Sequence, residues 1–214
     1  MDLYHFTTAR HGLDAIDRRR LKIATIQNLN DPFELLCADM SDPKFRKEMH
    51  VWKASMSARC GMLCFSESWQ NPVQWSHYAD RHRGICLKFQ VAEKMVRKVT
   101  YDDARTVEDA AKLIKNRTTD PEAVIRMMST KFKHWSYEAE WRAYVALRRS
   151  DPVTGLYFQT FNDDLKLVEV ILGAACEVKR ADVVRLDADV DIRNARLGFK
   201  KYEVVTQQDQ SHWR

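Results

Sequence analysis

Two acidic residues, Glu138 and Glu140, lie two positions apart in the segment Y-E-A-E-W-R, at the head of the alternating run W-R-A-Y-V-A-L. The alternation predicts a strand over residues 141–147, and because strand side chains have a period of two, both carboxylates are expected on one face. Each would then raise the proton affinity of the other, which is typical of acid–base catalysis or of a site that orients a hydroxyl-rich substrate. The alternative is a solvated surface ladder, in which Arg142 neutralises both acids.

Composition predicts one globular domain over residues 1–214. Hydrophobic residues make up 45% of the chain, its mean hydropathy is −0.51, and no stretch rich in Pro, Gly or Ser divides it. The longest apolar runs have the length of strands, and the N-terminus M-D-L-Y-H-F has no basic region followed by an apolar stretch. We therefore expect a cytoplasmic protein with no membrane association.

The five cysteines lie mostly among apolar neighbours, without the C-x-x-C spacing of a zinc site, and are expected to be reduced core residues. No metal site is predicted. The formal net charge of +5 favours an acidic partner, which would be a nucleotide, a nucleic acid or an acidic protein face. The alternative is that these charges only solvate the surface.

The chain opens with a predicted strand over residues 3–7, a helix from residue 9 and an extended segment over residues 21–26. The segment N-L-N-D-P-F-E has the pattern of a helix start, with Asp31 as N-cap, Pro32 at the first helical position and Glu34 three residues after the cap. This pattern gives Asp31 and Glu34 a capping role rather than a chemical one.

The rest of the chain alternates between both kinds of element, which predicts an α+β domain. The predicted helices cover residues 41–56, 72–82, 107–115 and 121–134. Besides residues 141–147, the predicted strands cover residues 62–65, 85–91, 96–101, 167–172 and 202–206, with a further element over residues 181–190.

Three other segments place polar residues in apolar surroundings: L-Y-H-F-T-T, G-M-L-C-F-S-E-S and W-S-H-Y-A-D-R-H-R-G-I-C-L-K-F. Together with L-N-D-P-F-E and W-S-Y-E-A-E-W-R, they resemble the bacterial domain of unknown function 2971 (DUF2971) family over most of residues 1–175. The order of a His in the first strand, a Ser ending a strand, a Tyr on the next helix and a late Glu also resembles, more distantly, the H-Y-E type of ADP-ribosyltransferases. These include the DarT-type enzymes and the poly-ADP-ribose polymerases.

The second resemblance implies an ADP-ribosyltransferase-like core, in which a split, bent β-sheet with peripheral helices holds NAD as co-substrate. By this resemblance, His5 would hydrogen-bond the ribose that carries nicotinamide, assisted by Thr7. Tyr78 would stack against the nicotinamide ring, and Ser66 would hold the carboxamide or shape the pocket. His77 and His82 are alternative polar contacts beside Tyr78.

In the same resemblance Glu140 takes the catalytic place. A carboxylate that accepts the proton of the ribose 2′-hydroxyl stabilises the oxocarbenium-like charge that develops when the bond to nicotinamide breaks. Glu138 would help to activate or orient the acceptor.

These expectations lead to an NAD-dependent ADP-ribosyltransferase that modifies nucleic acid or protein, as a toxin or phage-defence effector. One alternative is a binding module of the same fold, in which Tyr78 or Trp75 stacks a base and no turnover occurs. Another is an NAD glycohydrolase, in which water takes the place of the acceptor.

Overall fold

The computed structural model describes residues 1–105 and 120–213, and it confirms the predicted α+β class. The helices of this part of the chain are α1 (Ala9–Asp17), α2 (Pro43–Ser57), α3 (Pro72–Tyr78), α5 (Pro121–Met128) and α6 (Arg180–Leu186), with short 3-10 helices η1 (Ile26–Asn28), η2 (Glu93–Met95), η3 (Lys133–Glu138) and η4 (Gln210–His212). The strands are β1 (Asp2–Thr7), β2 (Arg20–Lys22), β3 (Ala24–Thr25), β4 (Cys60–Ser66), β5 (Ile85–Val91), β6 (Val96–Lys98), β7 (Thr100–Asp102), β8 (Thr130–Phe132), β9 (Glu140–Ala146), β10 (Phe158–Thr160), β11 (Leu165–Leu172), β12 (Asp191–Leu197) and β13 (Val204–Thr206).

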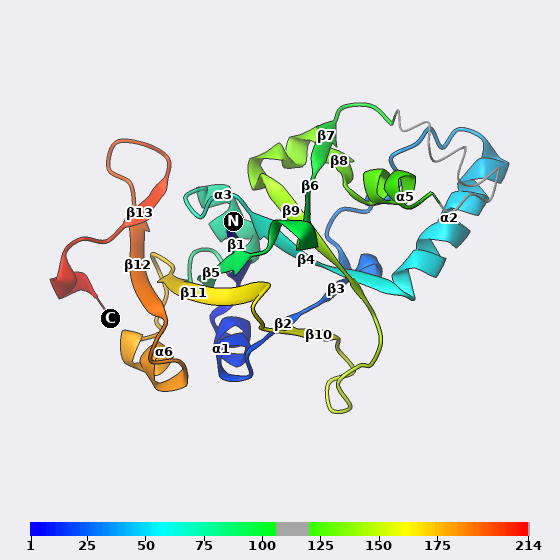
Figure 1. Cartoon of the computed structure of the whole chain (residues 1–214). Helices are drawn as coiled ribbons and strands as arrows, with labels where there is room; N and C mark the ends of the chain where they lie inside the picture. Colours follow the sequence, from blue (N-terminus) through cyan, green and yellow to red (C-terminus); the bar gives the residue numbers. More distant parts are fainter. Residues whose placement is uncertain (106–119, 214) are drawn as a thin grey trace.

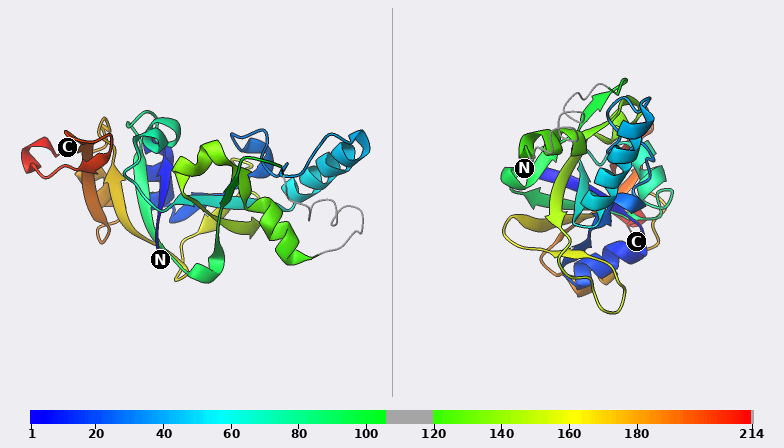
Figure 2. Two further views of the ribbon diagram at one scale, coloured as in Figure 1. Left: turned by 90° about the horizontal axis from the view of Figure 1, so that it is seen from above. Right: turned by 90° about the vertical axis from the view of Figure 1, so that its right-hand side faces the viewer.

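Nine of the described strands form the main sheet, in the order β13-β12-β11-β5-β1-β4-β9-β6, with β3 also paired to β4. Figure 1 shows this sheet through the middle of the molecule, with α2 and α5 toward one end and β12, β13 and α6 at the other. The view from above shows the same elongated arrangement (Figure 2). Within residues 1–105 and 120–213, no helix has the length and apolar character that crossing a bilayer requires.

The central strand β5, with the sequence I-C-L-K-F-Q-V, buries one face along its whole length and the other face at Cys86, whereas Lys88 is half-buried and Gln90 is exposed. Ile85 and Leu87 face the main core, to which α1 contributes Ile16 and α6 contributes Val183. On the other face, Cys86 packs in a cluster with Trp75 of α3. The cluster around Trp75 packs α3 against β1 and β5, and the main core packs α1 and α6 on the opposite face.

The sheet opens between β1 and β4. All six residues of β1 pair with β5, but its pairing with β4 is confined to Tyr4 opposite Ser66. Further along the same edge of β4, β3 pairs only with Gly61 and Met62. The remaining backbone of β4 on this side, over residues 63–65, therefore faces a gap rather than a neighbouring strand.

Three of the predicted helices differ from the structure: the one expected to start at Asp31, the one over residues 72–82, which ends at Tyr78, and the one over residues 121–134. Residues 31–35 form a turn, because Leu35 has a φ of +63°, and left-handed backbone does not continue an α-helix. The predicted cap bond is present nonetheless, since the Asp31 Oδ1 accepts from the Phe33 amide at 2.8 Å. The helix predicted over residues 121–134 ends at Met128, and the helix predicted over residues 107–115 lies outside the described residues.

Candidate functional site

Glu138 and Glu140 converge on one cation, but not in the way that the strand pattern predicts. Glu138 ends η3, Glu140 begins β9, and Ala139 joins them with a left-handed φ of +44°. Lys131 Nζ lies 2.5 Å from Glu138 Oε2 and 3.1 Å from Glu140 Oε2. Both carboxylates are buried, at 5% and 4% exposure, so the alternative of a solvated surface ladder is wrong.

The backbone that presents Glu138 is held by side chains from the β4–α3 segment. Ser66 Oγ and Gln74 Nε2 each donate to the Glu138 carbonyl oxygen at 2.7 Å. Asn71 Nδ2 donates to the Tyr137 carbonyl oxygen at 3.0 Å. Because these donors are themselves buried or part-buried, they fix the direction in which the Glu138 carboxylate points.

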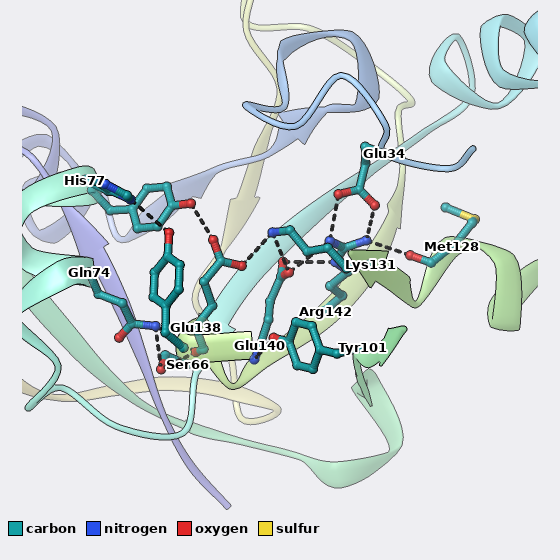
Figure 3. Close-up of polar contacts among 12 residues, drawn as sticks. Glu34, Ser66, Gln74, His77, Tyr101, Met128, Lys131, Glu138, Glu140 and Arg142 are labelled. Carbon is teal, nitrogen blue, oxygen red and sulfur yellow. Dashed lines mark hydrogen bonds and ion pairs between the residues drawn. The ribbon is translucent and has the colours of Figure 1, made fainter. Parts of the chain in front are cut away.

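Arg142 is the most enclosed charged side chain of the described residues, with 1% exposure. Its Nη1 and Nη2 bind both carboxylate oxygens of Glu34, at 2.6 and 2.9 Å, and its Nε and Nη2 bind Glu140, both at 2.9 Å. Nη1 also donates to the Met128 carbonyl oxygen at 2.7 Å. All five N–H groups of the guanidinium are therefore satisfied by these three partners. Figure 3 shows Glu34, Arg142, Glu140, Lys131 and Glu138 as a connected row.

The two acids differ in their proton affinity. Burial by itself raises the pKa of Glu140, but Arg142 and Lys131 outweigh it and lower that pKa to about 2. Burial also raises the pKa of Glu138, and there the opposing effect of Lys131 is too small to reverse the shift. Glu140 is thus a fixed anion, whereas Glu138 takes up a proton more readily than an ordinary glutamate.

A cavity of about 230 Å³ lies in the gap of the sheet and reaches these acids. One side of the cavity is lined by β1 (Tyr4, His5, Phe6), β4 (Cys64, Phe65, Ser66) and Gln74 and Tyr78 of α3. The other described lining residues are Ala24, Asn28, Leu29, Asn30, Asp31 and Trp135, together with the charged residues Glu34, Lys131, Glu138, Glu140 and Arg142. Four of these residues are carboxylates (Asp31, Glu34, Glu138, Glu140) and two are basic (Lys131, Arg142), so the described lining has a formal charge of −2 when all are ionised.

The structure brings most of the predicted site residues to this cavity. His5 lines it, with Nδ1 3.0 Å from the Cys64 carbonyl oxygen across the gap, and burial lowers the pKa of His5, which leaves the imidazole neutral at pH 7. The Tyr78 hydroxyl donates to Glu138 Oε1 in a short hydrogen bond. Ser66 also lines the cavity, although its hydroxyl is used to hold the Glu138 backbone. Thr7 is not among the described residues that line it.

The other aromatic and histidine candidates lie elsewhere. Trp75 has 0% exposure and donates through Nε1 to the Trp69 carbonyl oxygen, so the expectation that it stacks a base is wrong. His82 stacks on the Trp75 ring, with 6.1 Å between centroids. His77 is exposed, and its Nδ1 lies 2.9 Å from the Tyr137 hydroxyl. Neither histidine is among the described residues of the cavity lining.

Glu34 and Lys131 are site residues that the sequence did not reveal. The D-P-F-E pattern gave Glu34 a capping role, but its carboxylate binds Arg142 instead. Lys131 lay within a predicted helix, where a lysine has no distinctive signal. The unusual feature of both is burial, which requires the tertiary structure.

Aromatic and imidazole groups at the cavity suit an organic ligand better than a metal. Tyr78 and Trp135 supply ring faces or edges, and neutral His5 supplies a hydrogen-bonding group. Within residues 1–105 and 120–213, no three His, Cys, Asp or Glu side chains are grouped so that they could hold a metal ion.

Residues 74–143 match a family described as "Protein of unknown function (DUF2971)". This match supports the DUF2971 family predicted from the sequence motifs, and it includes Lys131, Glu138, Glu140 and Arg142 of the cavity lining. Comparisons with curated proteins and with solved structures gave no match.

We predict that Arg142→Met lowers the free energy of unfolding by about 3–5 kcal/mol, because it leaves Glu34 and Glu140 buried without their cation. Urea unfolding at pH 7 measures this loss. Arg149→Met is the matched control, since Arg149 is exposed, and it should change stability by less than about 0.5 kcal/mol. Equal stability of the two variants would contradict the role given to Arg142.

Proposed function

We propose that this protein cleaves the bond between nicotinamide and ribose in NAD and transfers ADP-ribose to a nucleic acid or protein acceptor, with an ADP-ribosyltransferase-like site in the gap between β1 and β4. The observation that carries the proposal is the convergence of His5, Tyr78, Glu138 and Glu140 on one cavity with an excess of carboxylates. These four residues come from three separate regions of the chain.

The charge of the cavity supports a cationic ligand group. NAD carries a positive charge on its pyridinium ring, and as the glycosidic bond breaks, the bonding electron pair neutralises the ring while positive charge develops on the ribose. A lining with a formal charge of −2 stabilises the ring in the bound state and the ribose in the transition state. The neutral His5 does not cancel this field.

The size of the cavity supports binding of one end of the dinucleotide. Its volume of about 230 Å³ is below the roughly 300–1,000 Å³ typical of pockets that enclose a drug-sized ligand. The nicotinamide and its ribose would enter, whereas the anionic pyrophosphate would stay at the mouth, away from the buried carboxylates.

We assign the proton-accepting role to Glu138. Of the two acids it has the higher pKa, and among the described residues only Tyr78 and Lys131 bind its carboxylate. In the transfer, C1′ of the ribose loses its bond to nicotinamide and gains a bond to the acceptor oxygen or nitrogen, and the proton of the acceptor passes to Glu138. Glu140 stays ionised, holds Lys131 and Arg142 in place and adds to the negative field.

A second candidate is a nucleotide-binding module without turnover. It is favoured by the state of Glu140, whose oxygens are all engaged by Arg142 and Lys131 and whose low pKa makes it a poor base. Nicotinamide release separates the two candidates, because the binding module would produce none.

Glu138→Gln should lower the rate of nicotinamide release from NAD by about two to four orders of magnitude, because it removes the proton acceptor and keeps the size of the side chain. Release is followed by chromatography with and without added single-stranded DNA, RNA or protein. Glu122→Gln, in the exposed first turn of α5, is the matched control and should be as active as the unchanged protein. Absence of nicotinamide release from the unchanged protein would refute the enzymatic proposal.

The pH profile should identify the same residue. Glu138 must be ionised to accept a proton, and its raised pKa places the acidic limb of activity above the 4.5 of an ordinary glutamate. Lys131 opposes this rise, so Lys131→Met should move the limb to still higher pH, whereas Lys131→Arg keeps the charge and should leave it nearly in place. Lys133→Met removes an exposed lysine two residues away and serves as control. A limb that does not move in Lys131→Met would exclude Glu138 as the titrating group.

A further inference from the structure

The loop between β12 and β13, residues 198–203, and Leu197 at the end of β12 present large apolar side chains to solvent. Phe199 is 88% exposed, Tyr202 is fully exposed at 101%, and Leu197 is 57% exposed. Figure 1 shows this loop projecting beyond the end of the sheet that carries α6. Two exposed aromatic rings on one loop mark a candidate interaction surface, because exposed apolar groups that cluster on a monomer are typical of binding sites.

Basic side chains surround these rings. The Arg196 guanidinium lies 4.2 Å from the centroid of the Phe199 ring, and its Nη1 donates to the Leu197 carbonyl oxygen at 2.9 Å. Lys200 and Lys201 are exposed, and no carboxylate in the described part of the chain forms an ion pair with either of them. Residues 196–203 hold three basic residues and one acidic residue, so the loop has a positive charge to offer an anionic partner.

The loop is anchored to the segment that builds the candidate site. The Gly198 amide donates to the Glu203 carbonyl oxygen at 2.8 Å and closes the loop. The Val204 amide donates to the Gln70 carbonyl oxygen, also at 2.8 Å, and the next residue, Asn71, holds the backbone of Tyr137 beside Glu138. The base of the loop is therefore linked through Gln70 and Asn71 to the backbone that positions Glu138.

We propose that this loop binds single-stranded nucleic acid, with unpaired bases stacked on Phe199 and Tyr202 and phosphates held by Lys200, Lys201 and Arg196. Exposed aromatic faces bind any base that is not already stacked in a duplex, and neighbouring lysines track the backbone. The further statement that the bound strand is the acceptor rests on the proposed function, whereas binding itself does not.

The test is the affinity of the full chain for fluorescein-labelled single-stranded DNA and RNA of about 12 nucleotides, a length within the usual range of stacking sites. The double variant Phe199→Ala/Tyr202→Ala should weaken binding by roughly 30-fold or more through the loss of two stacked bases. Lys200→Gln/Lys201→Gln should reduce the slope of log affinity against log salt by about 1.4, the value for two phosphate contacts on a single strand.

Val153→Ala is the matched control, because Val153 is 91% exposed on the turn at Asp151–Gly155 and should not affect binding. Nicotinamide release from NAD without nucleic acid should be the same in the loop variants and the unchanged protein, so failure of the loop proposal and failure of the NAD proposal are distinguishable. Unchanged affinity in Phe199→Ala/Tyr202→Ala would overturn the loop proposal. The proposal would also be overturned if the unchanged protein bound neither single-stranded DNA nor RNA, but bound phosphatidylserine vesicles and lost that binding in Phe199→Ala/Tyr202→Ala.

Discussion

The candidate site depends on the buried ion pairs of Arg142 with Glu34 and Glu140. The Arg142 side chain is fully buried, and all of its guanidinium donors are hydrogen-bonded to Glu34, Glu140 and the Met128 carbonyl oxygen. These partners belong to the Asp31 turn, to β9 and to the end of α5, so a single guanidinium ties three segments together. Burying these charges is costly unless all remain paired, which makes the arrangement intolerant of partial disruption. Because Arg142 holds these three segments together, it also holds in place the side of the cavity that carries Glu138 and Lys131.

The same network explains how two acids of similar sequence context acquire different properties. Both acids are buried, but Glu140 receives hydrogen bonds from Arg142 and Lys131 and stays ionised, whereas Lys131 is the only cationic partner of Glu138 among the described residues. The left-handed Ala139 lets both carboxylates reach Lys131, although only one of them lies on the strand. Glu140 therefore maintains the structure and the negative charge of the cavity, and Glu138 is the acid that can exchange a proton.

The sequence predicted the α+β class and most strands, because alternation is a property of the local chain, and by resemblance it named five residues that line the cavity: His5, Ser66, Tyr78, Glu138 and Glu140. It predicted neither the turn at Asp31–Leu35 nor the role of Glu34. The cap pattern D-P-F-E is locally correct, as the bond from the Phe33 amide to Asp31 shows, but the left-handed Leu35 and the attraction of Glu34 to Arg142 override it. Trp75 and Lys131 were misjudged for the same reason, since their burial is set by contacts between distant segments.

The central claim is that the cavity selects a positively charged ring, and calorimetric titration with 1-methylnicotinamide and with nicotinamide tests it most directly. The first is a pyridinium cation, the second is neutral, and neither has a glycosidic bond to cleave. Because the cavity lining is negatively charged, the cation should bind at least about tenfold more tightly at pH 7, equivalent to roughly 1.4 kcal/mol. Equal affinities, or tighter binding of the neutral ring, would contradict it.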